Sequence, residues 1–277
     1  MKLRQVTLGL LGVVGFLGTW ELLPLLGVVR AQYLPPASSA LSALFSEATT
    51  SGFWESVLDT LTAWFLGLLI ATVAALILGF VIGSFSVLRK LTNSTIEFLR
   101  PIPSVALIPL AVLLFGNRLE SSLMLIIYAS FWQVLIQVLY GVADVDNVAM
   151  NTAKSYGLSW WQRVRYVVWP TTLPYLMTGL RLGAAVALIL AITAELVIGS
   201  PGLGREIALA QSGAAIPTMY GLIVATGILG VLINLVMRFV DCSSDWLRDV
   251  GSHALTYTLE RFTDGGKGLY KIAFCCA

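Results

Sequence analysis

Long apolar segments alternate with short polar segments along this chain. Five of the apolar segments are long enough to cross a bilayer, which takes roughly 20 helical residues. They cover residues 8–29, 57–85, 121–140, 175–198 and 218–240. A sixth apolar segment, residues 104–115, is shorter. This pattern predicts an all-α polytopic membrane protein with six transmembrane helices.

Three prolines crowd the start of the shortest apolar segment, at Pro101, Pro103 and Pro109. Proline lacks a backbone donor and kinks or ends a helix, so we expect this span to be bent or broken. Broken membrane helices are tolerated where protein or a water-filled cavity satisfies the freed backbone. Pro103 is therefore a candidate for the wall of a translocation path. The alternative is a structural helix that is merely kinked.

Two of the long segments carry stripes of small residues. In the segment 57–85 the stripe repeats every four residues, and in the segment 175–198 it repeats every three or four. Small side chains let membrane helices approach one another closely, so we predict tight helix packing here rather than a pore lining. The first stripe is Gly67, Ala71, Ala75, Gly79 and Gly83, and the second is Ala184, Ala187, Ala191 and Ala194.

A polar, basic segment, residues 143–174, separates the fourth and fifth spans. A short helix can begin near Asn151, which is a good N-cap residue, and Gly157 can take the left-handed conformation that ends it. A second, amphipathic helix follows the capping residue Ser159 and is expected to end at Pro170. The segment therefore predicts a helix-turn-helix bracket outside the membrane. The alternative is an ordinary interfacial loop that binds nothing.

Four polar residues within the predicted spans are candidates for the translocation path. Gln133 and Gln137 lie one turn apart on one helix face, where they either hydrogen-bond across helices or line a polar path. Arg181 and Glu195 belong to the same helix but are separated by ~21 Å along its axis, so they do not pair. Glu195 is near the outer end, either as a gate or packing contact or as a carboxylate that reaches the external interface.

Composition and charge fix the class and the orientation. The chain of 277 residues is 57% hydrophobic and 12% charged, whereas soluble domains are about 25% charged. Six spans with both termini in the cytoplasm place ten of the first thirteen basic residues inside and three outside, as the positive-inside rule requires. The net charge of +2 therefore reflects topology rather than nucleic-acid binding. Arg89, Lys90 and Arg100 mark a predicted cytoplasmic loop. The inner residues are Lys2, Arg4, Arg89, Lys90, Arg100, Lys154, Arg163, Arg165, Arg181 and Arg238, and the outer residues are Arg30, Arg118 and Arg205.

The sequence shows no nucleotide-binding, catalytic or metal-binding motif. Its nearest approach to a phosphate-binding loop is residues 199–206, where Arg-Glu replaces Lys followed by Ser or Thr. Cys242, Cys275, Cys276 and the single His253 are not in metal-ligand spacing. We therefore predict no catalytic residue, metal or cofactor in this chain.

The polar segment reproduces the spacing of the cytoplasmic loop by which permeases of ATP-binding-cassette (ABC) importers engage their ATPase: EAA, three residues, Gly, nine residues, I-x-L-P. The triplet is here Asn151, Thr152 and Ala153, and Gly157 and Pro170 are 13 residues apart. Residues 60–240 resemble the inner-membrane permeases of the nitrate, sulfonate, taurine and bicarbonate importer family, which implies a MetI-like core. The segments that carry this resemblance are RPIPSVALIPLAVLLFG (100–116), WPTTLPYLMTGLR (169–181) and AELVIGSPGLG (194–204).

The resemblance implies that this chain lies in the lipid of a bacterial inner membrane and works with partner proteins. These are a second copy of the permease, two cytoplasmic ATPases that bind the ATP and Mg, and a periplasmic or lipid-anchored solute-binding protein. Asn151 replaces an acidic residue of the family, which removes a carboxylate that could pair with a basic residue of the ATPase. The implied coupling loop consists of Asn151, Thr152, Ala153, Lys154, Gly157, Leu158, Ser159, Arg163 and Pro170.

The sequence leaves the solute open. It is a small anion of the nitrate, sulfonate or bicarbonate type, or alternatively a thiamine-precursor pyrimidine or an aromatic acid. An ATP-independent channel or secondary carrier would be a different class, and it would be expected to show inverted repeats. The chain divides into residues 1–56 (first helix and external segment), 57–242 (transport core) and 243–277 (a cytoplasmic tail without an assigned role).

Overall fold

The computed structural model describes the backbone of residues 2–260 and the side chains of residues 7–9 and 11–241. Within this part of the chain every regular element is helical. The long helices are α1 (Lys2–Leu25), α3 (Ser51–Ser84), α6 (Leu119–Ala143), α9 (Trp169–Ile198) and α11 (Ile216–Glu260). The short elements are α2 (Ala37–Ala48), α4 (Ser86–Leu99), the 3-10 helix η1 (Ser104–Leu107), α5 (Ile108–Phe115), α7 (Asn147–Ser155), α8 (Trp160–Arg163), the π-helical turn η2 (Val164–Val168) and α10 (Leu203–Ser212).

Five helices of the described chain are long and apolar enough to cross a membrane, and a sixth span is formed if α4 and η1–α5 are counted together. These two parts are bent by 80° at residues 100–103, so the expectation of a broken third span is confirmed. The prediction of a loop around Arg89 and Arg100 is wrong, because residues 86–99 form α4. Ile96 and Leu99 of α4 pack against the apolar cluster that α6 builds. This burial comes from a distant segment and is not visible in the local sequence.

The core of the protein is formed where α3, α6 and α9 pack together. Gly79 of α3 faces Val138 of α6, and a Cβ atom added to Gly79 would lie 2.6 Å from Val138 Cγ1. Gly67 and Gly83 meet α6 in the same way, and Ala71 and Ala75 between them are fully buried. The prediction that this stripe packs against another helix is confirmed.

The second small-residue stripe lies in the same core. Ala184, Ala187, Ala191 and Ala194 of α9 are all buried. Trp64 of α3 reaches across to this stripe, and its Nε1 donates a hydrogen bond of 2.9 Å to the backbone oxygen of Ala184. Close approach of the backbones makes this contact possible, so both stripes act in packing.

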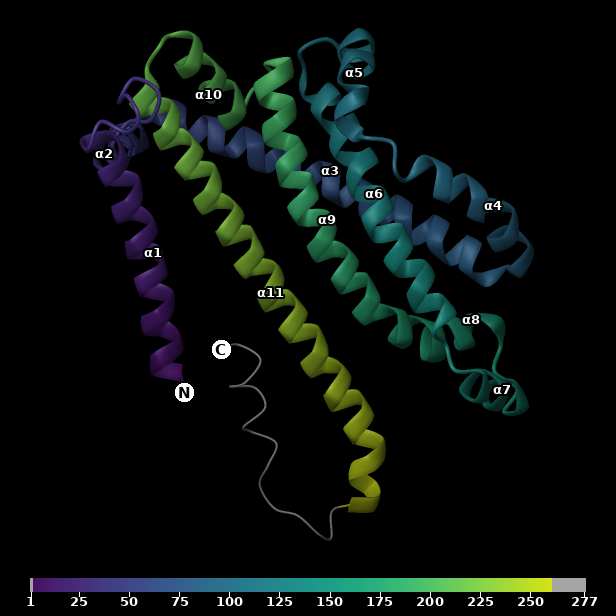
Figure 1. The fold of residues 1–277 in the computed structure, drawn as a ribbon. Helices are drawn as coiled ribbons and strands as arrows, with labels where there is room; N and C mark the ends of the chain where they lie inside the picture. The colour runs from purple at the N-terminus through teal and green to yellow at the C-terminus, as the bar shows by residue number, and fades with distance from the viewer. Residues whose placement is uncertain (1, 261–277) are drawn as a thin grey trace.

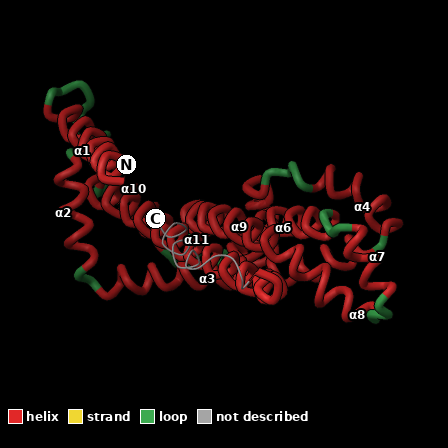
Figure 2. Tube along the Cα trace, turned by 90° about the horizontal axis from the view of Figure 1, so that it is seen from below, coloured by secondary structure: helices red, strands yellow, loops and turns green. Residues whose placement is uncertain are grey.

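Short helices lie at the two ends of the bundle. In Figure 1, α2, α5 and α10 lie at one end and α7 and α8 at the other, which is also the end where α1 begins. Figure 2, seen from below, places α1 and α2 at one side of the molecule and α4, α7 and α8 at the opposite side. The α3–α6–α9 core lies between these two groups and holds them apart.

The helix α1 is attached to the rest of the protein near its C-terminal end. Glu21 accepts hydrogen bonds from the backbone N–H and the hydroxyl of Ser38, at 2.9 and 2.8 Å, and thereby caps the start of α2. Trp20 Nε1 donates to the backbone oxygen of Pro35 at 3.0 Å. The apolar window of α1 is otherwise not buried within the chain.

The last helix is longer than the hydrophobic pattern predicts. We expected the sixth span to end at residue 240, but α11 continues to Glu260. The remainder of the predicted tail, residues 261–277 with Cys275 and Cys276, lies outside the described residues.

Candidate functional site

The polar segment between α6 and α9 forms two short helices joined by a tight turn. We name residues 144–168 the coupling segment; it contains α7, α8 and η2. Gly157 has a positive φ of 73°, as predicted for a residue that ends a helix. The N–H of Gly157 donates to Lys154 O and the N–H of Leu158 donates to Ala153 O, at 2.9 and 3.1 Å. These two bonds make a Schellman motif, which fixes the direction in which the chain leaves α7.

The start of α8 is equally well defined. Ser159 Oγ accepts from the N–H of Gln162 at 3.4 Å, and Gln162 Oε1 accepts from the N–H of Ser159 at 2.8 Å. This reciprocal capping box satisfies two N-terminal donors of the helix. The prediction that Ser159 caps a second helix is therefore confirmed, and the turn between α7 and α8 is held from both sides.

Two predictions about this segment are wrong. The first helix begins at Asn147 rather than near Asn151, because Asp146 is the N-cap and its Oδ1 accepts from the N–H of Val148 at 2.9 Å. Pro170 does not end the second helix, which continues without a break from Trp160 to Ile198. The π-helical turn η2 immediately precedes Pro170 and changes the hydrogen-bonding register there. Pro170 directly follows this change of register, and the helix continues through it into α9.

The predicted coupling residues lie on an exposed unit. Ala153 is buried and anchors α7, whereas Asn151, Thr152 and Lys154 are exposed. Gly157, Ser159 and Pro170 are also exposed, and Leu158 and Arg163 are half-buried. Tyr156 at the end of α7 is 81% exposed. The structure thus places the predicted coupling residues on and around one protruding helical bracket (Figure 1).

The base of the coupling segment is fixed to the core. Tyr175 of α9 donates a hydrogen bond of 2.7 Å to the carboxylate of Asp144, across the two ends of the segment. At Gly141 the backbone of α6 comes so close to α9 that an added Cβ would lie 2.9 Å from Thr172 Cα. Trp169 stacks on Phe80 of α3 with ring centroids 5.8 Å apart. The base of the segment is therefore tied to α3, α6 and α9.

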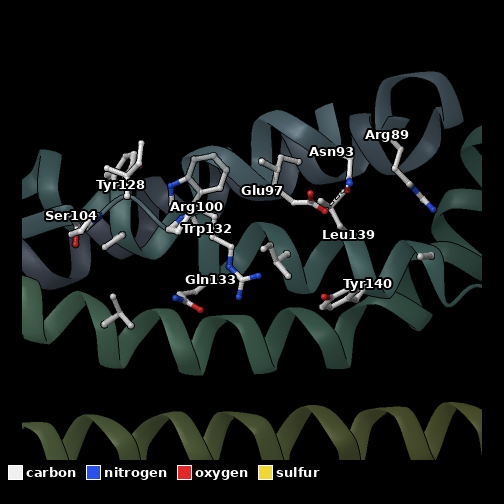
Figure 3. A pocket seen from close by; sticks show the side chains of 18 residues that line it. Arg89, Asn93, Glu97, Arg100, Ser104, Tyr128, Trp132, Gln133, Leu139 and Tyr140 are labelled. Carbon is white, nitrogen blue, oxygen red and sulfur yellow. Dashed lines mark hydrogen bonds between the residues drawn. The ribbon is translucent and has the colours of Figure 1, made fainter. Parts of the chain in front are cut away.

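A second candidate site is a pocket of about 720 Å³ between α4, the bend that follows it, and one face of α6. Figure 3 shows its polar side chains, with Arg100 and Gln133 in the middle of this view and Glu97, Asn93 and Arg89 to one side. Pro103 and Gln133 line this pocket, so two of the predicted path residues come together here. Its wall is formed by Arg89, Asn93, Ile96, Glu97, Arg100, Pro101, Ile102, Pro103, Ser104, Tyr128, Ala129, Trp132, Gln133, Ile136, Leu139, Tyr140, Ala143 and Val186.

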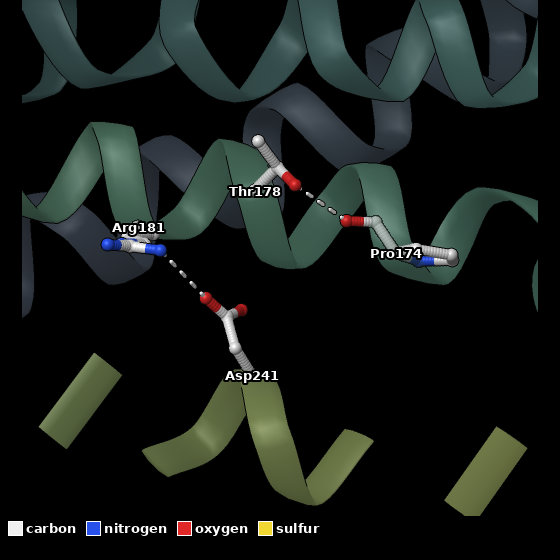
Figure 4. A network of polar contacts seen from close by, with 4 residues as sticks. All are labelled: Pro174, Thr178, Arg181 and Asp241. Carbon is white, nitrogen blue, oxygen red and sulfur yellow. Dashed lines mark hydrogen bonds and ion pairs between the residues drawn. The ribbon is translucent and has the colours of Figure 1, made fainter. Parts of the chain in front are cut away.

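The other predicted path residues lie elsewhere. Gln137 packs against Gly179 of α9, where an added Cβ would lie 3.0 Å from the Gln137 Cβ. Arg181 of α9 faces Asp241 of α11, with a distance of 3.9 Å between Nη1 and Oδ2 (Figure 4). Neither residue lines the pocket between α4 and α6.

Glu195 is fully buried, which excludes the interpretation that it reaches the external interface. Its Oε2 accepts from Thr60 Oγ1 of α3 and from the N–H of Gly204, both at 2.9 Å. Thr60 Oγ1 in turn accepts from the N–H of Leu203 at 2.9 Å. Glu195 and Thr60 therefore cap the N-terminus of α10, whose first N–H groups have no partners within the helix. The carboxylate is a packing contact that joins α9, α10 and α3.

This contact also explains the glycine-rich segment that resembles a phosphate loop. Gly202 has a φ of 145°, and a Cβ at this position would overlap the carboxylate of Glu195. The backbone N–H groups at the start of α10 point to Glu195 and Thr60. The segment is thus built around a carboxylate of the chain itself.

Sequence reasoning missed most of the pocket wall, including Arg100 and Trp132. Arg100 was interpreted only as an orientation signal, although it lies directly before Pro101 at the bend. Trp132 was treated as part of an apolar span, although it precedes Gln133 and lines the same cavity. A polar residue beside a break in a short span was the signal that could have identified Arg100.

Comparisons with known proteins agree with this architecture. The family described as "Binding-protein-dependent transport system inner membrane component" matches residues 67–242. The chain is 31% identical to the taurine transport system permease protein TauC of Escherichia coli (strain K12), over 85% of this chain and 87% of that protein. It is 27% identical to the putative aliphatic sulfonates transport permease protein SsuC of Bacillus subtilis (strain 168), over 84% of each.

A solved structure supports the same fold. A chain of the MetNI methionine ABC transporter, in an inward-facing conformation, superposes with a TM-score of 0.59 at 18% identity and covers 68% of this chain and 94% of its own length. The all-helical MetI-like architecture expected from the sequence is therefore confirmed. With its bent span, its bracket between α6 and α9 and this likeness over most of its length, the chain belongs to the family of inner membrane components of binding-protein-dependent transport systems.

Proposed function

We propose that this ABC importer permease forms the path for a small anion and receives mechanical work from cytoplasmic ATPases through its coupling segment. The observation that supports this proposal best is the form of that segment. Its outer helix, α7, is exposed along most of its length, whereas its base is tied to α6 and α9 by the hydrogen bond between Tyr175 and Asp144.

The geometry suggests how the work is transmitted. An ATPase that pushes on α7 contacts Asn151, Thr152 and Lys154, which are exposed on it. The Schellman motif at Gly157 and the capping box at Ser159 keep α7 and α8 at a fixed angle. Because η2 and α9 continue α8 without a break, the push moves the spanning helix directly.

We further propose that the complete importer contains two copies of this chain, two ATPases and a solute-binding protein. The family description names binding-protein-dependent transport, and the superposed structure is that of an ABC transporter. In this arrangement the ATPases hold ATP and Mg and perform the hydrolysis. The chain contributes the membrane path and the contact through which hydrolysis drives it. Both termini and the coupling segment face the cytoplasm of a bacterial inner membrane, as the distribution of basic residues favours.

The solute proposed is a small anion of the sulfonate, nitrate or bicarbonate type. Similar proteins are named for taurine, aliphatic sulfonates, nitrate and bicarbonate. The pocket between α4 and α6 carries two arginines against one glutamate, so its charge suits an anion.

The test compares two glycines that both have a positive φ and that follow the C-terminal ends of two helices, Gly157 after α7 and Gly199 after α9. Gly157 has a φ of 73° and Gly199 a φ of 80°, and an added Cβ meets no atom within 4 Å at either position. Valine is strained at such a φ, so each substitution distorts one turn. We expect Gly157→Val to uncouple ATP hydrolysis from uptake in reconstituted importer, and Gly199→Val to lower the yield of folded protein without changing the ratio of solute moved per ATP.

Arg163→Glu provides a second test at the base of the segment. The Arg163 side chain is half-buried and its Nε has no hydrogen-bond partner within the described chain. Charge reversal is expected to uncouple hydrolysis from uptake while the permease still inserts. Normal coupled uptake in both Gly157→Val and Arg163→Glu would refute the coupling role, and uptake by the permease without ATPases would identify a channel or secondary carrier instead.

A further inference from the structure

The pocket between α4 and α6 has a donor that the protein itself does not use. Trp132 is only 9% exposed, and its Nε1 has no hydrogen-bond partner among the side chains and backbone that the structure describes. A buried donor without an acceptor is unfavourable and is rare in native proteins. The indole lies edge-to-face with Phe131 and Tyr128, at centroid distances of 5.0 and 6.0 Å, so its orientation is fixed. The wall of the pocket therefore contains a buried, preorganised N–H group that no acceptor of the described chain uses.

Arg100 supplies the positive charge beside this donor. The guanidinium of Arg100 makes no ion pair or hydrogen bond with any described residue. Arg89, by contrast, already has a partner within the protein: its Nη2 donates a hydrogen bond of 2.8 Å to Gly83 O in the last turn of α3. Glu97 is held by Asn93, whose Nδ2 donates to Oε1 at 2.9 Å. Arg100 is thus the charge in this pocket that is free to bind a ligand.

The rest of the wall distinguishes between classes of anion. Ile96, Ile102, Ile136 and Val186 contribute apolar surface, while Gln133 adds an amide beside Arg100 (Figure 3). The pocket volume of about 720 Å³ lies within the range of small-molecule sites. A nitrate or bicarbonate ion has no apolar part, so it would leave the side chains of Ile96, Ile102, Ile136 and Val186 uncovered. An anion with an apolar body fills both the polar and the apolar parts of the cavity.

We propose that this pocket binds a short organic anion, with its oxyanion head on Arg100, Gln133 and the indole N–H of Trp132 and its carbon body on the isoleucines. The head is a sulfonate or a carboxylate, because guanidinium groups pair with such groups through two parallel hydrogen bonds. The inference rests on the proposed function for its role in transport, and it narrows the solute from any small anion to an organic one.

The test measures access to a cysteine placed in the pocket. Ser104 lines the pocket, and Ser104→Cys is introduced into the full-length permease with Cys242, Cys275 and Cys276 replaced by Ser. The permease is reconstituted with its ATPase in lipid nanodiscs, and modification of the new cysteine is followed by mass spectrometry. Two methanethiosulfonate reagents of similar size are compared, one carrying an ethylsulfonate and the other an ethyl-trimethylammonium group. Ethanesulfonate and nitrate are then tested as protecting ions at equal ionic strength.

We expect faster modification by the sulfonate reagent and protection by ethanesulfonate at concentrations where nitrate has little effect. Arg100→Gln should reduce the preference for the sulfonate reagent by about tenfold, the effect of losing one charge-assisted hydrogen bond. Trp132→Phe keeps an aromatic ring but removes the donor, and should raise the ethanesulfonate concentration needed for protection several-fold. Lys90→Gln removes a neighbouring charge of α4 that does not line the pocket, and should leave both measurements unchanged.

Equal protection by nitrate and ethanesulfonate would overturn the proposal, since a simple attraction of anions would explain it. Absence of protection by either ion would also overturn it. ATP-driven uptake separates this inference from the proposed function. Normal uptake of an organic anion in Arg100→Gln would refute the pocket but keep the importer, whereas protection without any ATP-driven uptake would keep the pocket and refute the importer.

Discussion

Replacing Glu195 tests whether this buried carboxylate is a structural cap or part of the solute path. The structure gives it no exposed surface and two hydrogen bonds, from Thr60 Oγ1 and from the N–H of Gly204. In Glu195→Ala both donors lose their acceptor inside the protein, and the N-terminus of α10 loses its cap. In Glu195→Gln an acceptor oxygen and the side-chain volume remain. The two variants therefore separate loss of the hydrogen bonds from loss of the charge.

The expected magnitudes follow from these contacts. Each buried donor left unpaired costs about 1–3 kcal/mol, so Glu195→Ala is expected to destabilise the protein by about 4 kcal/mol. Glu195→Gln keeps an acceptor oxygen for the two donors and weakens rather than removes their hydrogen bonds, and should cost about 1 kcal/mol. For a protein of this size 1 kcal/mol corresponds to about 2–4 °C in the unfolding midpoint. The alanine variant should therefore unfold about 10 °C below the parent, and the glutamine variant a few degrees below it.

The assay is thermal unfolding of the purified permease in lipid nanodiscs, followed by intrinsic tryptophan fluorescence. Uptake by the reconstituted importer is measured in parallel, well below the unfolding midpoints. Glu120→Ala is the control, because Glu120 is an exposed carboxylate at the start of α6, and its midpoint should fall by no more than about 3 °C, the loss of one exposed charge near a helix N-terminus. The reasoning is refuted if Glu195→Ala keeps the parent midpoint but loses uptake, since the carboxylate would then act on the solute.

Two further predictions concern packing and the base of the coupling segment. Gly79→Ala should lower the unfolding midpoint by about 5 °C, because its Cβ overlaps Val138 and such overpacking typically costs 1–3 kcal/mol. Gly227→Ala, where an added Cβ meets no atom within 4 Å, should cause no loss, and Val138→Ala should restore part of the loss in the Gly79 variant. Equal midpoints for the two alanine variants would contradict close packing of α3 on α6. Tyr175→Phe removes the hydrogen bond to Asp144 and should speed hydrogen exchange in α7 but not in α10; unchanged exchange in α7 would show that this bond does not hold the segment.

Two glutamates of the spanning helices perform the same structural task. Glu21 of α1 accepts from the N–H of Ser38 at the start of α2, and Glu195 of α9 accepts from the N–H of Gly204 at the start of α10. In both cases the carboxylate also satisfies a hydroxyl, and the short helix presents the positive end of its dipole. Acidic residues are costly inside a membrane unless they are paired. Their pairing with helix N-termini gives both carboxylates a structural reason to be present in apolar helices.

The hydrophobic pattern by itself determined the class, the number of spans and the bracket between the fourth and fifth spans. These features depend on local quantities: the length of an apolar run, the spacing of small residues and the turn chemistry of Gly157 and Ser159. The close approach of α3 and α6 was predictable for the same reason, since a stripe with a period of four lies on one helix face whatever its partner is. The structure confirms the helical class, the bracket and the close approach of α3 and α6. It contains five helices long enough to cross a membrane, and the predicted sixth span is present if the bent pair of α4 and η1–α5 is counted as one.

Tertiary structure decided which polar residues lie together. The four candidates for the path are all polar residues within apolar spans, yet only Gln133 joins Pro103 at the pocket, while Gln137, Arg181 and Glu195 contact three different partners. Tertiary structure also placed the helix of residues 86–99 against α6, where Ile96 and Leu99 are partly buried. Position along a helix fixes the direction of a side chain, but its partner depends on which helices pack against that face. That packing is set by distant segments: Tyr128 and its partner Leu99 are 29 residues apart, and Thr60 and Glu195 are 135 residues apart. No local pattern specifies it.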